Sequence, residues 1–249
     1  MPRLSSGNAP AHQTLVPSSA ARRRDVARID RALEAHYGRI RRRRRRDALG
    51  TLIATIISQH TSDTNTDRAF ARLRARFPTW TAVRAAPVRA VIDAIRSAGL
   101  SALKAPRIQA VLRRLAAERG TLSLTFLRRW PAARAKAWLL SLDGVGPKTA
   151  AIVLVFGLGK PSFAVDTHVY RIGKRTGLIP ARLSAEQAHD WMDALVRPAR
   201  RGPFHLLLIR HGREICTARA PRCERCPVRR WCAYYATLRG AGVARAKQP

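Results

Sequence analysis

The nine residues LDGVGPKTA, Leu142 to Ala150, join two predicted helices through a very short turn. Gly144 and Gly146 can adopt backbone angles that are closed to other residues, and without side chains they let an anion approach the backbone N–H groups. Pro147 suits the first position of a helix, so a helix N-terminus begins at the same point. The segment predicts a hairpin that binds phosphate without reading base sequence. For Gly-x-Gly alone, an ordinary glycine-rich helix connection is the alternative.

The surrounding chain is also predicted to be helical. Apolar residues recur at three- and four-residue spacing and no run alternates with period two, so the sequence indicates an all-α fold. Pro87 and Gly99 bound one helix, and Ser184 with Gln187 forms a capping box before another. The predicted helices cover residues 26–37, 48–58, 63–77, 88–98, 105–117, 131–142, 148–158, 185–196 and 203–215.

The chain is strongly basic. Its 249 residues hold 48 Lys and Arg against 15 Asp and Glu, a formal net charge of +33, and 46% of them are hydrophobic. The apolar content excludes a disordered tail protein, and the charge concentrates a polyanion, so nucleic acid is the predicted partner. The run from Arg39 to Arg46, broken only by Ile40, is either a solvated face or a phosphate-contacting patch.

The sequence predicts neither a membrane span nor a secretory signal at the N-terminus. No apolar stretch approaches the roughly 20 residues that span a bilayer, and the polar N-terminus lacks the apolar segment of a secretory signal. We therefore expect a cytoplasmic protein with no membrane partner. Residues 1–20 are predicted to be a disordered N-terminus, and residues 237–249 a flexible tail.

Lys148 lies in the first turn of the helix that follows the hairpin. The positive end of the helix macrodipole and the surrounding cationic charge disfavour a protonated amine there. A neutral amine beside a sugar-phosphate can attack the anomeric carbon, form a Schiff base and permit β-elimination of the 3′ phosphate. Lys148 is therefore a candidate nucleophile, with a plain phosphate contact as the alternative.

A lone carboxylate follows 18 positions later, in the segment AVDTHV at residues 164–169. Asp166 can accept the amine's proton, cap the following helix, or offset positive charge that builds up on a sugar ring. The alternative is that Asp166 only caps the helix, and this role is compatible with a catalytic one. We expect His168 to pack against a helix rather than to bind a metal.

Four cysteines crowd into one 17-residue window in the pattern C-x6-C-x2-C-x5-C. A disulfide scaffold would scatter them, and zinc ribbons bring two close pairs together across a longer loop, so the spacing favours an iron–sulfur cluster over zinc. Arg219 and Arg222 lie between the first two ligands and are expected to contact phosphate. The predicted ligands are Cys216, Cys223, Cys226 and Cys232.

Taken in order, the hairpin, the Val165-Asp166-Thr167-His168 motif and the cysteine cluster closely resemble the endonuclease III family of DNA repair glycosylases, in the helix-hairpin-helix superfamily. The likeness covers about Ala21 to Tyr235. It implies that the hairpin grips the DNA backbone, that Lys148 is the Schiff-base nucleophile and that Asp166 assists it. It also implies that the four cysteines bind a [4Fe–4S] cluster.

The resemblance also implies an architecture. We expect a six-helix domain over residues 41–160, with the helix-hairpin-helix at about 131–158. A cluster domain would combine residues 21–40 with residues 161–236. Double-stranded DNA that holds a damaged base or an abasic site would lie in the cleft between them. The protein is expected to act as a monomer on the nucleoid in the cytoplasm.

Family members flip a damaged pyrimidine out of the duplex and fill the gap from two loops. One loop corresponds to residues 57–63, where His60, rather than Gln59, stands opposite the family's inserted glutamine. The other corresponds to residues 98–101, where Leu100 would be the apolar wedge. Histidine in place of glutamine leaves the range of lesions open.

The predicted activity is that of a bifunctional DNA glycosylase and AP lyase for oxidised or ring-saturated pyrimidines. One alternative is a monofunctional adenine or mismatch glycosylase, which needs no amine at the position of Lys148. Adenine-specific relatives also carry a glutamate before the first gap-filling loop, and residues 52–57 contain no acid. The other alternative is a non-catalytic DNA-binding module with a structural or redox-active cluster.

Overall fold

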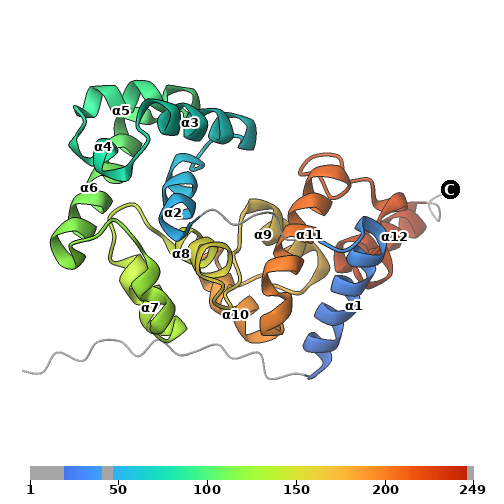
Figure 1. The fold of residues 1–249 in the computed structure, drawn as a ribbon. Helices are drawn as coiled ribbons and strands as arrows, with labels where there is room; N and C mark the ends of the chain where they lie inside the picture. The colour runs from blue at the N-terminus through green and yellow to red at the C-terminus, as the bar shows by residue number, and fades with distance from the viewer. Residues whose placement is uncertain (1–19, 41–46, 246–249) are drawn as a thin grey trace, which may run out of the picture.

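The computed structural model describes residues 20–40 and 47–245, the latter with side chains to residue 239. These residues form helices and turns and contain no strand, which confirms the all-α prediction (Figure 1). The predicted disordered residues 1–19 and most of the arginine run, residues 41–46, lie outside the described residues. The α-helices are α1 (Ala20–Tyr37), α2 (Ala48–Ile57), α3 (Asp63–Arg76), α4 (Trp80–Ala85), α5 (Val88–Ala94), α6 (Ser101–Arg119), α7 (Ala132–Leu140), α8 (Pro147–Ile152), α9 (Thr167–Thr176), α10 (Gln187–Leu195), α11 (Arg201–Glu214) and α12 (Ala233–Arg245).

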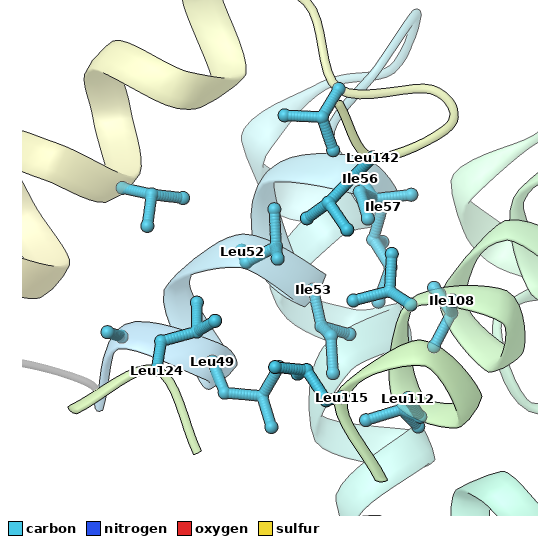
Figure 2. Close-up of a cluster of buried hydrophobic side chains, with 14 of the residues drawn as sticks. Leu49, Leu52, Ile53, Ile56, Ile57, Ile108, Leu112, Leu115, Leu124 and Leu142 are labelled. Carbon is cyan, nitrogen blue, oxygen red and sulfur yellow. The ribbon is translucent and has the colours of Figure 1, made fainter. Parts of the chain in front are cut away.

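Helix α2 forms the centre of the first hydrophobic core, which spans residues 48–158. All ten of its residues are buried, because the sequence ALGTLIATII is apolar around the whole helix. Figure 2 shows Ile53 of α2 on the side of the helix toward Ile108, Leu112 and Leu115 of α6. Asp47 caps the helix, its carboxylate accepting the Gly50 N–H at 2.7 Å. A rigid α2 fixes the loop that leaves its C-terminal end.

The second core joins the two ends of the chain. It combines residues 26–33 of α1 with residues 163–228, and Figure 1 shows α1 (blue) beside α11 and close to α12 (orange to red). Arg200 forms two hydrogen bonds to the Asp30 carboxylate, at 2.7 and 2.8 Å, and a third to Glu34 at 2.9 Å. Such a planar bidentate pair fixes the register of α1. The predicted domain boundaries stay a prediction.

Several predicted helix boundaries are wrong. The helix predicted over 88–98 ends at Ala94, followed by a 3-10 turn (Arg96–Ala98), and α6 begins at Ser101 instead of 105 because the Leu100 carbonyl already accepts its first hydrogen bonds. The helix predicted over 148–158 becomes π-helical at Val153–Leu158. Residues 237–245, predicted to be a flexible tail, belong to α12. Helices α4 and α12 were not predicted, and α9 was expected only as the helix that Asp166 would cap, without a range.

The capping box is confirmed. Ser184 N–H donates to the Gln187 side chain at 3.0 Å, and Gln187 N–H donates back to the Ser184 hydroxyl at 3.2 Å.

None of the helices in the described part of the chain has both the length and the hydropathy needed to cross a bilayer.

Candidate functional site

The predicted hairpin lies between α7 and α8. Leu142 and Val145 anchor it, since both are buried and the Val145 N–H donates to the Leu142 carbonyl at 3.1 Å. Gly144 has φ +73° and a Cβ there would lie 2.6 Å from Arg107 Cδ, so the fold itself requires glycine. Gly146 differs, because its φ is −88° and a Cβ would meet no atom within 4 Å. Its missing side chain leaves open surface for a ligand to approach the backbone.

Lys148 is exposed at the second position of α8. The next two residues, Thr149 and Ala150, are buried and hold the helix against the core. No side chain caps the N-terminus of α8. The lysine therefore projects from a fixed backbone beside the open glycine surface.

Asp166 lies at the N-cap of α9 and is half-buried. Its Oδ1 accepts the Val169 N–H at 2.7 Å, which confirms that it caps the following helix. His168 packs against α11, where a Cβ on Gly212 would come within 2.8 Å of the His168 Cβ. Burial lowers the pKa of His168, as expected for a packed ring.

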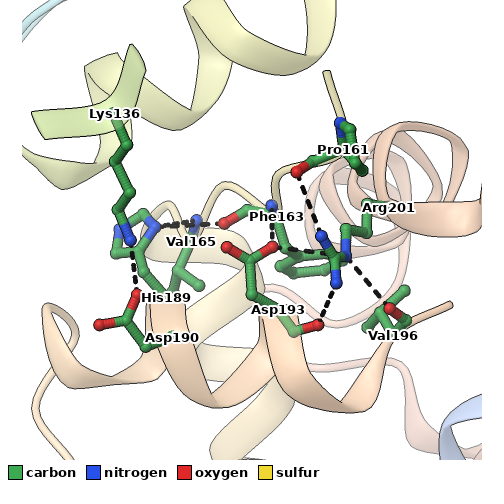
Figure 3. Close-up of polar contacts among 9 residues, drawn as sticks. All are labelled: Lys136, Pro161, Phe163, Val165, His189, Asp190, Asp193, Val196 and Arg201. Atoms are coloured by element: carbon green, nitrogen blue, oxygen red, sulfur yellow. Dashed lines mark hydrogen bonds and ion pairs between the residues drawn. The ribbon is translucent and has the colours of Figure 1, made fainter. Parts of the chain in front are cut away.

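The segment leading to Asp166 is tied to α10 and α11 through its backbone (Figure 3). The Phe163 N–H donates to Asp193 Oδ1 at 2.7 Å, and Arg201 donates to the Pro161 carbonyl at 3.1 Å. Arg201 Nε lies 3.4 Å from Asp193 Oδ1. Burial raises the pKa of Asp193 and the Arg201 charge opposes it. Asp166 therefore enters α9 from a segment held at several points.

His205, on α11, is a buried histidine bound to the segment that leads to Asp166. Its ring is buried and its Nδ1 donates to the Ala164 carbonyl at 2.9 Å. Burial lowers the pKa of His205, the Asp166 carboxylate opposes this, and the Lys148 charge adds to it. Lys148 and Asp166, 18 positions apart in sequence, thus lie within electrostatic range of one buried ring. Sequence reasoning missed His205, because a histidine in an apolar helix carries no signal of its partners.

His189 supports the same segment and makes stability depend on pH. Its Nδ1 lies 3.3 Å from the Val165 nitrogen, and burial lowers its pKa to about 4. The unfolded chain, with a histidine pKa of about 6.5, binds the extra proton first as pH falls. This contribution is therefore complete above pH 6.5 and is lost between pH 6.5 and about 4.

We expect His189 to account for roughly 2 kcal/mol of the fall in unfolding free energy between pH 7 and 4.5. In His189→Gln, which does not titrate, the pH dependence should be shallower by that amount. Denaturant unfolding of both proteins at matched pH values measures it. Parallel curves would show that His189 is protonated equally in the folded and unfolded chains.

Each of the two predicted gap-filling loops contains one residue with a strained backbone conformation. His60 has φ +53° and Leu100 has φ +48°, and within the described ranges they are the only residues other than glycine with positive φ. This conformation costs roughly 1–2 kcal/mol for a side chain with a Cβ. Both residues are exposed, Leu100 to 53%. Leu103, which sequence reasoning missed, is exposed to 56% on the next turn.

The side chain of Gln59, unlike that of its neighbour His60, is bound to the hairpin. Its Nε2 donates to the Gly144 carbonyl at 2.9 Å, 85 positions away in sequence. The side chain thus anchors the first loop to the hairpin, while His60 occupies the tip. The hairpin and the first gap-filling loop, both predicted to contact DNA, are therefore adjacent in the folded protein.

The four cysteines surround one pocket between α11 and α12, which encloses about 280 Å³ of space partly open to solvent. Arg175 donates to Cys216 Sγ at 3.3 Å, and His211 Nε2 lies 3.5 Å from Cys226 Sγ. In the described ranges, no three His, Cys, Asp or Glu side chains converge as a single metal ion requires. Four thiols spread around a pocket fit a larger cluster, which would bond all four. Arg219 and Arg222 are exposed on the adjoining loop.

Comparison with known proteins identifies the family to which this chain belongs. The profile of the HhH-GPD superfamily of base excision DNA repair proteins matches residues 53–198. The endonuclease III of Thermotoga maritima is 35% identical over 199 residues, which cover 80% of this chain and 88% of that protein. The chain belongs to the endonuclease III family.

Other relatives agree with the family assignment. A putative DNA glycosylase of Arabidopsis thaliana is 37% identical over 169 residues, 68% of this chain, and the chain spans 57% of that protein's length. A solved endonuclease III, trapped as a covalent intermediate with DNA, matches with a TM-score of 0.75 at 25% identity and covers 87% of this chain and 98% of its own. A thermostable thymine-DNA glycosylase, with a TM-score of 0.72 at 23% identity over 87% of this chain and 98% of its own, shares the fold.

Family membership confirms the fold and the cofactor. The chain is a base excision repair DNA glycosylase of the endonuclease III family. The iron–sulfur binding domain of endonuclease III matches residues 216–232, from the first cysteine to the last. The predicted [4Fe–4S] cluster is thereby confirmed over zinc. When bound, it supplies metal–thiolate bonds that tie α11 to α12.

Loss of one cluster ligand should affect DNA affinity more than chemistry. We expect Cys226→Ser to lose the cluster's visible absorption and to weaken DNA binding by about tenfold, as when a few phosphate contacts are lost. Borohydride trapping at saturating abasic DNA should stay within about threefold of the unmodified protein. Absorption spectra, fluorescence anisotropy and trapping gels measure the three quantities. Slower trapping by a folded variant with unchanged affinity would contradict the expectation.

Proposed function

We propose that this family member is a bifunctional DNA glycosylase and AP lyase that removes oxidised or ring-saturated pyrimidines. The observation that carries the proposal is the hairpin geometry, which leaves Lys148 exposed in the first turn of α8 beside the open surface at Gly146, together with Asp166 at the N-cap of α9. The lyase reaction requires an amine nucleophile and a group that accepts its proton, and Lys148 and Asp166 are the proposed pair.

The chemistry follows from these two groups. The neutral Lys148 amine attacks the anomeric carbon, the bond to the damaged base breaks, and the base leaves with the bonding electrons and takes up a proton. Asp166 accepts the proton released by the amine and offsets the positive charge on the sugar. The C1′–O4′ bond of the resulting aminal then breaks, O4′ takes up a proton, and the opened sugar carries the imine to Lys148. The imine acidifies the C2′ proton, so removal of that proton expels the 3′ phosphate. Water finally hydrolyses the imine and frees the lysine.

The proposed substrate is double-stranded DNA that contains a damaged base or an abasic site. Gly144 and Gly146 would hold the DNA backbone, and His60 and Leu100 would enter the space left by the extruded base. Gln59 would contact the DNA beside this space and not enter it, since its amide is bound to the hairpin. The strained, exposed tips support this assignment, because strain of this kind gathers at functional sites.

The cluster half would supply a second DNA contact. Arg219 and Arg222 are exposed on the loop between the first two cysteines, where cluster ligation would hold them in place. We propose that the protein works as a monomer on the nucleoid in the cytoplasm. Several phosphate contacts imply that affinity falls steeply with salt, because binding releases counterions.

Oligonucleotide cleavage tests the proposal. The cluster-loaded protein is incubated with duplexes that contain dihydrothymine, thymine glycol, a G·T mismatch or no lesion, and each sample is divided for treatment with or without alkali. We expect strand cleavage without alkali, on the damaged pyrimidines only. Cleavage only after alkali, especially at the mismatch, would establish a monofunctional glycosylase instead. Binding without base release from any duplex would establish a non-catalytic module.

A further inference from the structure

A buried lysine lies beneath both gap-filling loops. Lys104, on the first turns of α6, is 1% exposed. Its ammonium donates to the Ile57 carbonyl at 2.7 Å and to the Ala98 carbonyl at 2.9 Å. The two acceptors lie on different segments, one at the end of α2 and one in the turn before α6.

Both carbonyls come just before a strained loop tip. Ile57 precedes His60 by three residues, and Ala98 precedes Leu100 by two. One ammonium therefore fixes the points from which both tips project. Because it is charged, each of its hydrogen bonds is stronger than one between neutral groups.

Burying a charged ammonium costs free energy, so the buried position of Lys104 must be offset by what its ammonium binds. Burial lowers the pKa of Lys104, which reflects that cost. An apolar side chain of the same length would fill the space but would leave two carbonyls without this donor. The gain that a lysine offers over such a side chain is a fixed link between the two loops.

We propose that Lys104 is a positioning residue that holds the His60 and Leu100 tips at a fixed separation, so that both enter the duplex together when the damaged base leaves the stack. The inference rests on the proposed function, in which these tips fill the gap. Lys104 touches neither DNA nor the reacting sugar and acts through the two loops.

Gln109 provides a matched control on the same helix. It is 4% exposed, and its Nε2 donates to the Val83 carbonyl at 3.0 Å and to the Ala86 carbonyl at 2.7 Å. Both acceptors belong to α4 and the residue after it, away from the two tips. Gln109→Met thus removes two buried hydrogen bonds to carbonyls, as Lys104→Met does, without touching the loops.

The test uses the cluster-loaded protein and a duplex with a tetrahydrofuran abasic analogue opposite 2-aminopurine, whose fluorescence rises when it is unstacked. We expect the unmodified protein and Gln109→Met to raise the fluorescence, and Lys104→Met to bind with most of that rise lost. Base release from a paired damaged pyrimidine should fall by about ten- to a hundredfold in Lys104→Met, while trapping on single-stranded abasic DNA stays within about threefold. Lys104→Gln, which keeps amide donors, should recover part of both signals.

The remaining outcomes overturn the proposal. An unchanged fluorescence rise in Lys104→Met would show that the link is not needed, and equal losses in Lys104→Met and Gln109→Met would reveal a general effect on the fold. If neither Lys104 variant folds while Gln109→Met does, the lysine serves the core alone. The abasic analogue requires no chemistry, so the fluorescence comparison decides the inference even if the unmodified protein fails to trap or release any base.

Discussion

Lys148→Ala is expected to abolish the covalent adduct that borohydride traps on a duplex with one abasic site. The amine is the only group proposed to form the imine, so the trapping rate should fall by roughly 10³-fold or more. Binding to a tetrahydrofuran duplex should change by no more than about threefold, under ~1 kcal/mol, because the chain's net charge of +33 would still attract the phosphates. Trapping gels and anisotropy titrations measure the two effects.

Lys174→Ala is the matched control for the lost charge. Lys174 lies in the last turn of α9, at the opposite end of the helix from the Asp166 cap, and donates to the Pro180 carbonyl at 3.0 Å. This variant should trap at the unmodified rate. If Lys148→Ala instead loses affinity in the same proportion as trapping, the lysine is a phosphate contact and another group forms the imine. Undiminished trapping by Lys148→Ala would have the same consequence for its role.

Asp166→Asn is expected to slow base release and trapping by about 10²–10⁴-fold, the usual contribution of a positioned acid or base. Asparagine caps helices as well as aspartate does, so α9 keeps its hydrogen bond to the Val169 N–H. The thermal midpoint should therefore hardly move. Single-turnover rates on a damaged duplex and thermal unfolding measure the two effects.

Asp47→Asn is the matched control, because it neutralises a helix-capping carboxylate that is not proposed to take part in the chemistry. Asp47 caps α2 with the same 2.7 Å geometry, far along the chain from the candidate catalytic groups. This variant should match Asp166→Asn in stability and the unmodified protein in rate. Equal rates for the two variants would reduce Asp166 to a helix cap and leave the proton of the Lys148 amine to another acceptor.

Local features of this fold were predictable because they depend on neighbours in sequence. The capping box at Ser184 and the buried hydrophobic helix α2 follow from side chains within one or two turns. The helix predicted over 88–98 was wrong because the turn at Ala98 is fixed by Lys104, a contact that helical periodicity does not contain. The range of helix α9 was not predicted, although Asp166 was identified as a possible cap for a helix at that point.

The candidate site also combines residues that the sequence predicts with contacts that only the folded structure shows. By itself the sequence determined the helical class and the basic charge, and it predicted the four cluster ligands and the pair Lys148 and Asp166, because these residues stand in recognisable motifs. Only the tertiary structure decided that Gln59 anchors the loop while His60 forms its tip. It alone placed Lys104 between two loops, since the hydrogen bonds of Gln59 and Lys104 span 85 and 47 positions. Backbone carbonyls accept those bonds, and a carbonyl is the same in every residue, so no sequence pattern identifies the partner.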